Sequence, residues 1–120
     1  RQTYSVEGGQ FAAEHLLGLD ATAIVACSDE MALGAIRAVR RRGLSVPGDV
    51  SVVGYDDSAL MEFTDPPLTT VRQPVDRLAS AAARGLVAMI SGQEVVTGEL
   101  LFQPELVVRA STGPYPSPSA

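Results

Sequence analysis

The run VSVVGYDD at residues 50–57 carries the strongest architectural signal in this chain of 120 residues. Short, unbroken apolar runs of this kind are typical of strands buried on both faces of a parallel sheet. A second such run, AIVACSD, lies at residues 23–29 and also ends in polar side chains. Residues 29–42 have the apolar spacing of a helix, and the order strand, helix, strand favours a right-handed parallel crossover. The sequence therefore predicts the α/β class, with an open parallel sheet and flanking helices.

The segments on either side of this unit give weaker signals of the same type. Ser5 can cap a helix over residues 6–17, and Pro74 suits the first turn of a long helix that ends at Gly92. We expect the apolar stripe of that long helix to be core. Residues 112–120 are rich in Pro, Ser and Gly, and they should be loose because they bury too little surface to become ordered. Short extended pieces are expected at residues 69–72, 99–102 and 106–109.

Composition and charge exclude several classes of protein. The 14 acidic and 9 basic residues give a net charge of −5, so the surface repels phosphate and counterion release cannot drive duplex binding. The basic run Arg40-Arg41-Arg42 fits a solvated helix end that complements the helix dipole better than it fits phosphate contact. Apolar runs fall short of the ~20 residues that a membrane span requires. The start at Arg1 has neither a signal core nor an initiator Met, and we expect it to lie inside a longer chain.

Candidate groups for catalysis or metal binding are sparse. Cys27 is the single cysteine, which excludes an internal disulfide and a multi-cysteine zinc site, and its apolar neighbours predict a buried thiol. His15 is the single histidine, and its place beside Leu16 and Leu17 favours a helix-surface or boundary position over a catalytic base. We find no nucleophile–base pair and no Gly-rich phosphate loop. The sequence therefore predicts that the chain is not an enzyme and holds no cofactor or metal.

The polar residues at the two strand ends are the best candidates for a site. Ligands of open α/β sheets bind beyond the carboxyl ends of the strands, where this sequence places Ser28 and Asp29 after one strand and Asp56 and Asp57 after the other. One carboxylate can accept hydrogen bonds from two neighbouring hydroxyls of a polyol. The alternative for both Asp56 and Asp57 is that they only cap the turn after the strand. A shared metal is disfavoured because adjacent residues on a strand end point to opposite faces.

Three linked motifs resemble the lactose-repressor-like (LacI/GalR) transcription regulators. They are SDEMALGA at residues 28–35, GLSVPGDVSVVGYDD at residues 43–57 and PLTTVRQP at residues 67–74. The resemblance extends from about Val6 to Ser111, with the motifs in the family's order and spacing. It implies a two-lobed effector-binding domain of the periplasmic-binding-protein-like type I fold, with a helix-turn-helix head outside this chain. Residues 1–71 would be the later half of the carboxyl-side lobe, 72–111 a hinge crossing, long helix and return strand, and 112–120 a disordered tail.

The resemblance also implies roles for individual residues. Asp56 looks like the family's acceptor for sugar hydroxyls, Ser28 stands where many members have an Asn that contacts effector, and Gln73 looks like a contact near the cleft. Ser28 is shorter than Asn and lacks the amide, which bears on the identity of the effector. The expected ligand-binding set is Asp56, Ser28, Gln73 and Asp29. The expected subunit-pairing set is Met31, Ala35, Leu60, Phe63 and Thr64.

Taken together, the resemblance implies the effector-sensing part of a cytoplasmic, dimeric repressor. Its partners would be a carbohydrate-like small molecule and operator DNA, and the DNA would be bound only by the head outside this chain. No membrane is expected among the partners. The alternative is a periplasmic sugar-binding protein for transport or chemotaxis, which shares the fold. The small residues of the segment 31–39 allow either close subunit approach or tight packing within the chain. Because the chain alone would expose strand edges and apolar stripes, we expect it to self-associate or exchange elements.

Overall fold

The computed structural model describes residues 3–94 and 102–118 and divides the chain into two compact units. The larger unit contains Arg1–Arg72 and Leu106–Ala120, and the smaller contains Gln73–Glu105. The larger unit holds α1 (Val6–Leu17), β1 (Ala23–Val25), α2 (Asp29–Arg41), β2 (Ser51–Val53) and β3 (Thr70–Arg72). The smaller unit holds α3 (Val75–Ile90), and β4 (Glu105–Val107) begins at its last residue.

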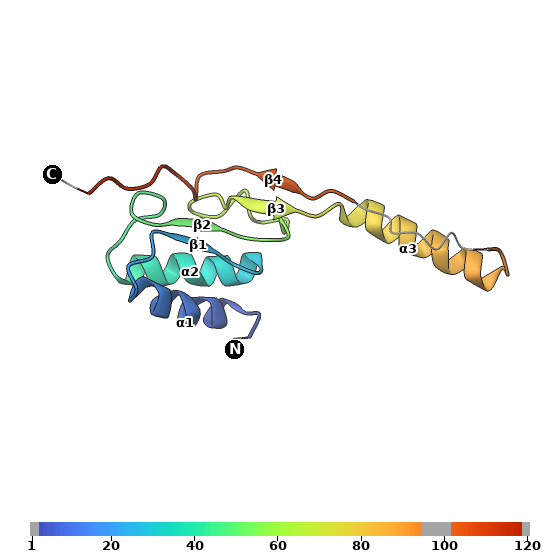
Figure 1. Ribbon diagram of the computed structural model, residues 1–120, viewed down its shortest axis with the longest axis horizontal. Helices are drawn as coiled ribbons and strands as arrows, with labels where there is room; N and C mark the ends of the chain where they lie inside the picture. The colour runs from blue at the N-terminus through green and yellow to red at the C-terminus, as the bar shows by residue number, and fades with distance from the viewer. Residues whose placement is uncertain (1–2, 95–101, 119–120) are drawn as a thin grey trace. The chain divides into compact units, whose positions relative to one another are not determined.

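β1, β2 and the β3 segment run parallel to one another, as predicted. β1 pairs with β2 in parallel, with Ile24 opposite Val52 and Val25 opposite Val53. Parallel bridges from Val53 to Thr69 and from Asp56 to Arg72 connect β2 with the β3 segment, and β3 pairs with β4. β1 and β2 therefore end at the same edge, as Figure 1 shows, so the residues that follow them share that edge.

Two capped helices cover one side of these strands. The hydroxyl of Ser5 accepts a hydrogen bond from Gly8 N at the start of α1, and that of Ser28 accepts one from Met31 N at the start of α2. Each satisfies a backbone donor that the first turn leaves unpaired. α2 lies between the strands and α1 (Figure 1). The core is formed by residues of both helices, of β1 and β2 and of the segments that adjoin the strands; the largest of its fully buried side chains are Leu68, Val39, Val50 and Val52.

The two helices approach each other closely because each has a glycine at the crossing. A Cβ at Gly34 of α2 would overlap the carbonyl oxygen of Val6, and a Cβ at Gly9 of α1 would overlap the backbone of Met31. Ala35 follows Gly34 directly and is 1% exposed within this chain, which accounts for its small side chain without a second subunit; its place in the subunit-pairing set stays a prediction. The small residues at this crossing serve packing within the chain, against α1.

β1 differs from the prediction of a strand buried on both faces. Ile24 is buried at 6% exposure, but Val25 is 79% exposed and Ala23 is also exposed. Cys27 is exposed as well, contrary to the prediction of a buried thiol. Figure 1 shows α1 and α2 on one side of β1 and β2, and Ile24 belongs to the same buried cluster as residues of these two helices. The apolar run identified the strand correctly but could not show which faces are covered within this chain.

The smaller unit consists mainly of α3, which confirms the long helix predicted after Pro74. None of the residues of α3 is buried, however. The prediction that its apolar stripe is core is therefore wrong for the part of the chain that the structure describes: Val75, Leu86, Met89 and Ile90 are all at least 59% exposed. The strand expected at residues 99–102 lies mostly outside the described residues, and the strand expected at residues 106–109 corresponds to β4.

The segment after β4 returns to the larger unit and packs against it. Ser111 is fully buried, and its hydroxyl donates to Val52 O at 2.6 Å and accepts from Thr69 N at 2.8 Å. Beyond it, the Thr112 hydroxyl contacts that of Thr69, and Gly113 N donates to the Ser51 hydroxyl. The prediction of a loose tail from residue 112 is therefore wrong for Thr112 and Gly113, which are held by strands that lie about 40 to 60 residues earlier.

Candidate functional site

Ser28 and Asp56 lie at the shared carboxyl edge of β1 and β2. Each follows its strand by three residues, and a backbone hydrogen bond from Asp29 N to Tyr55 O at 3.0 Å joins the two segments beyond the strands. Ser28 is partly exposed and Asp56 is exposed, so neither is sealed within the core. The structure thus brings together, at an accessible sheet edge, two of the four residues predicted to bind ligand.

The two side chains offer complementary hydrogen-bonding groups. The carboxylate oxygens of Asp56 can accept hydrogen bonds. The Ser28 hydroxyl accepts from Met31 N at 3.2 Å, and this bond leaves its proton available for donation. This edge of the sheet can therefore both accept hydrogen bonds from a bound molecule and donate a hydrogen bond to it. Such a combination suits a compound with several hydroxyl groups.

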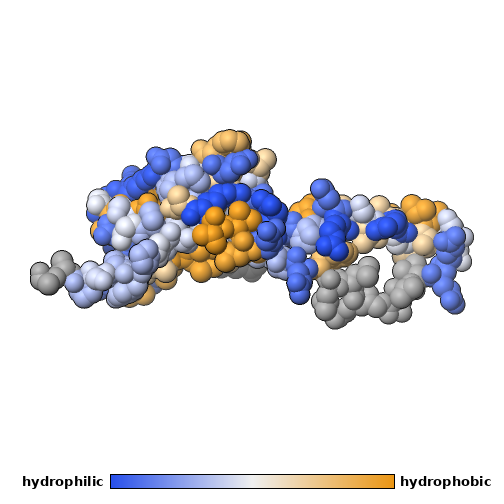
Figure 2. Space-filling view, turned by 90° about the horizontal axis from the view of Figure 1, so that it is seen from above, coloured by the Kyte–Doolittle hydropathy of each residue, from blue (hydrophilic) through white to orange (hydrophobic). Residues whose placement is uncertain are grey.

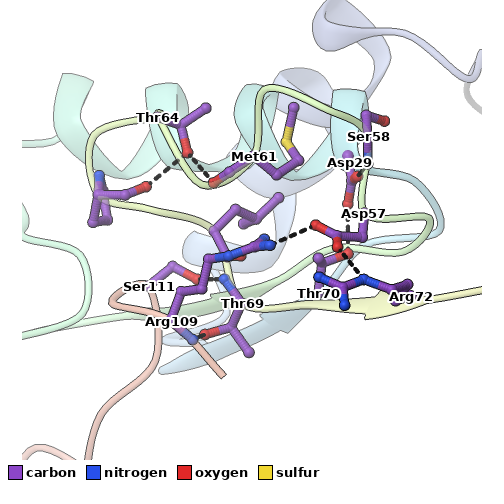
Figure 3. Close-up of polar contacts among 12 residues, drawn as sticks. Asp29, Asp57, Ser58, Met61, Thr64, Thr69, Thr70, Arg72, Arg109 and Ser111 are labelled. Carbon is purple, nitrogen blue, oxygen red and sulfur yellow. Dashed lines mark hydrogen bonds and ion pairs between the residues drawn. The ribbon is translucent and has the colours of Figure 1, made fainter. Parts of the chain in front are cut away.

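Asp29 has a structural position and does not fit the predicted ligand contact. It is 1% exposed, and its two carboxylate oxygens accept hydrogen bonds from the Thr70 hydroxyl at 2.6 Å and from Ser58 N at 2.7 Å. Figure 3 shows it turned toward Thr70 and Ser58, joining the start of α2 to β3 and to the loop after β2. Because this carboxylate is buried and both of its oxygens are hydrogen-bonded within the chain, we leave Asp29 out of the candidate contact set.

The backbone at the end of β2 has an unusual conformation. Asp56 has φ 123° and Asp57 has φ 60°, values that residues with a side chain rarely adopt. Such residues cost on the order of 1–3 kcal/mol each and persist where surrounding contacts determine the conformation. Asp56 N donates to Val71 O at 2.9 Å, so one of these contacts is the parallel pairing with the β3 segment. Two consecutive strained residues at a sheet edge are typical of a functional position.

Asp57 is held by two arginines. Arg72 Nε lies 2.7 Å from one of its carboxylate oxygens and Arg109 Nη2 lies 2.8 Å from the other, as Figure 3 shows. Burial, with 7% of the side chain exposed, acts to raise the pKa of Asp57, but the hydrogen bonds and positive charges of Arg72 and Arg109 outweigh it and lower the pKa below its ordinary value of 3.8. Asp57 is therefore a buried carboxylate kept ionised by its partners.

Gln73 follows the last residue of β3 directly and is partly buried. It is the first residue of the smaller unit, whereas Ser28 and Asp56 belong to the larger unit. Its predicted contact near the ligand therefore stays a prediction.

The remaining residues of the predicted subunit-pairing set lie on the larger unit with mixed exposure. Leu60 and Phe63 are 68% and 75% exposed, Met31 and Thr64 are partly buried, and hydrophobic atoms reach the surface at several places (Figure 2). Leu60, Phe63 and Thr64 lie in the loop between β2 and β3. A groove of about 510 Å³ lies between α2 and residues 64–65 of this loop. Its lining residues are Leu33, Ile36, Arg37, Arg40, Arg41, Thr64 and Asp65. Subunit pairing through Leu60 and Phe63 stays a prediction.

Sequence reasoning missed the two arginines that surround Asp57. Arg72 stands inside a recognised motif and Arg109 in a strand-like piece, but nothing in their local pattern shows that they meet one carboxylate from positions 15 and 52 residues away. One signal could have suggested the contact. Arg72 ends one short strand and Arg109 follows another, and an acidic pair follows a third strand.

Two further searches concern the described residues only. Within residues 3–94 and 102–118, no group of three or more His, Cys, Asp or Glu side chains is arranged to hold a metal ion. None of the helices described there has the length and apolar character needed to cross a membrane.

Comparison with known proteins places the chain in a family. A family model described as a periplasmic binding protein-like domain matches residues 2–112. The chain belongs to this family. The transcriptional regulator MalR of Streptomyces coelicolor, of the helix-turn-helix type, is 59% identical over 113 residues, which are 94% of this chain and 33% of that protein. The chain thus spans about a third of the length of the curated relatives it matches.

Solved structures extend this family assignment. The regulator CelR in complex with cellobiose is 39% identical with a TM-score of 0.85, covering 92% of this chain and 34% of that one. A lac repressor dimer bound to operator and the anti-inducer ONPF is 37% identical with a TM-score of 0.84, covering 92% and 39%. These matches confirm the resemblance to lactose-repressor-like regulators and the predicted fold class. The relatives are transcription regulators and not enzymes.

Proposed function

We propose that this chain is part of the effector-sensing region of a bacterial transcription regulator, and that its effector is a carbohydrate. The observation that carries the proposal is the position of Ser28 and Asp56 at one accessible edge of paired parallel strands. This edge belongs to a chain that is 39% identical to a regulator solved with cellobiose. Asp56 accepts hydrogen bonds from sugar hydroxyls, and Ser28 donates one to a sugar oxygen.

The wider function follows from the regulators that the chain resembles. A net charge of −5 disfavours the binding of operator DNA by this chain, so we assign DNA contact to a separate head, with the site sensing effector from a distance. Such a protein acts as a dimer in the cytoplasm and catalyses no reaction. The similarity to MalR, CelR and the lac repressor favours a regulator over the alternative of a periplasmic protein for sugar transport.

A binding experiment on the intact protein tests this proposal. A thermal-shift screen of monosaccharides and disaccharides, with cellobiose included, should raise the melting temperature for at least one sugar because ligand binding stabilises the folded state. Calorimetry with the sugar that gives the largest shift should then show about tenfold to a hundredfold weaker binding for Asp56→Ala, since hydrogen bonds to a charged acceptor contribute about 1.5–3 kcal/mol.

The matched control is Asp65→Ala, which removes a carboxylate of the same unit that is 96% exposed and lies in the loop beside α2. Its sugar affinity should equal that of the unchanged protein. Equal affinities for Asp56→Ala and the unchanged protein would refute the role of Asp56. A screen in which no sugar shifts the melting temperature would refute the choice of a carbohydrate.

A further inference from the structure

The carboxylate of Asp57 contacts both ends of the route by which the chain leaves and rejoins the larger unit. Arg72 is the last residue of the larger unit before the smaller one begins at Gln73, and the chain returns at Leu106, three residues before Arg109. Arg72 binds one oxygen of Asp57 and Arg109 binds the other. A single buried side chain thus joins the departing and the returning segments within the larger unit.

The same residue adjoins the proposed effector contact. Asp56 precedes Asp57, pairs with Arg72 through a parallel bridge and donates its backbone N–H to Val71 O. Arg109 adds further bonds on the returning side: its Nη1 donates to Leu68 O at 2.9 Å and its backbone N–H donates to the Thr69 hydroxyl at 2.9 Å. A displacement of the Asp56-Asp57 peptide would therefore change contacts in the segment that leaves the larger unit at Arg72 and in the segment that returns before Arg109.

Burial and conformation distinguish this contact from an ordinary surface ion pair. The side chains of Asp57 and Arg109 are 7% and 14% exposed, while that of Arg72 is 51% exposed. In the pair formed by Arg40 and Asp65, the carboxylate itself is 96% exposed and the arginine 48%. Exposed pairs contribute little because solvent screens them. Asp56 and Asp57 also both have positive φ, a conformation that needs external support, and the two arginines provide it.

We propose that Asp57 is a positioning residue that couples Asp56 to the two segments connecting the units, so that effector binding at Asp56 is felt where the chain leaves and rejoins the larger unit. The proposal rests on the proposed function for its effector. The coupling itself depends only on contacts within the larger unit, so it can be measured without any ligand.

Hydrogen exchange on the intact protein, read by mass spectrometry, tests the coupling. Asp57→Asn removes the charge and faces the arginines with an amide that has fewer acceptor sites. We expect exchange to become about tenfold faster or more in peptides covering residues 54–58, 69–72 and 106–110 together, because charge-assisted hydrogen bonds that restrain them are lost. Arg72→Gln and Arg109→Gln should each reproduce part of this effect, and they serve if Asp57→Asn does not fold.

The matched control is Asp65→Asn, which breaks the exposed pair with Arg40 and should leave all three peptides unchanged. Faster exchange at residues 54–58 alone would overturn the coupling. A uniform increase that includes α1 and α2 would also overturn it, because it would mean that the ion pairs only stabilise the unit as a whole.

The same hydrogen-exchange measurement in the presence of cellobiose tests whether ligand binding at Asp56 acts through Asp57. In the unchanged protein, cellobiose should slow exchange in all three peptides, whereas in Asp57→Asn the protection should be confined to residues 54–58. Protection of all three peptides in Asp57→Asn would overturn the proposal. If cellobiose binds neither protein, the choice of cellobiose as effector fails, while the ligand-free exchange still decides the coupling.

Discussion

At the scale of single residues, two adjacent carboxylates at the end of β2 have different surroundings. Asp56 is exposed at the sheet edge, and Asp57 is buried between Arg72 and Arg109. Sequence alone left both residues open to either ligand contact or turn capping. Successive residues at a strand end point in different directions, and the carboxylate of Asp57 is the one placed between Arg72 and Arg109.

The environment of Asp57 predicts a pH-dependent stability. Its folded-state pKa is lowered below 3.8, so its contribution is fully present above the unfolded pKa and is lost as pH falls below 3.8 through the folded pKa. At pH 6, urea titration should show Asp57→Asn less stable than the unchanged protein by about 1–3 kcal/mol. The difference should shrink at pH 3 and below. A difference that stays constant down to pH 2 would contradict this assignment.

At the scale of elements, the crossing of α1 and α2 depends on glycine. Gly34→Ala would place a Cβ against the carbonyl oxygen of Val6 and 2.6 Å from Gln10 N. Since these are backbone atoms that cannot move aside cheaply, we expect a loss of about 1–3 kcal/mol or more in unfolding free energy. The measurement is chemical denaturation followed by circular dichroism.

Gly85 of α3 provides the matched control for this substitution. A Cβ at Gly85 would meet nothing within 4 Å, so Gly85→Ala should favour the helix by about 0.5–1 kcal/mol through propensity alone. If Gly34→Ala behaved like Gly85→Ala, the close contact of α1 with α2 would not be a constraint on the fold.

At the scale of the whole molecule, much apolar surface stays uncovered within the described residues. Val25 of β1 is 79% exposed, Phe63 of the loop before β3 is 75% exposed and Ile90 of α3 is 78% exposed. Uncovered strands and apolar faces favour association. We therefore predict that the 120-residue chain, produced alone, self-associates. Light scattering coupled to size exclusion should give a mass above 12.5 kDa, and a monomer at all concentrations tested would contradict the prediction.

The sequence by itself determined the local structure of this protein and its family. Periodicity and capping residues located α1, α2 and α3, because helix signals depend on neighbours within a few positions. The apolar runs located β1 and β2, and the carboxyl ends of parallel strands share an edge, so the placement of Ser28 and Asp56 at one edge of the sheet was also predictable. The three linked motifs then identified the family.

Only the tertiary structure decided which polar residues are available and which apolar residues are covered. Asp29 and Asp56 look alike in sequence, yet Thr70 and Ser58 occupy both oxygens of Asp29, and contacts between distant segments leave no local pattern. The same holds for Ser111 beneath β2 and for Asp57 between its arginines. Apolar spacing likewise predicts a helix or a strand, but it does not predict which of its faces is buried. Burial depends on what packs against the element, and Val25 and the residues of α3 are exposed because nothing in the described residues covers them.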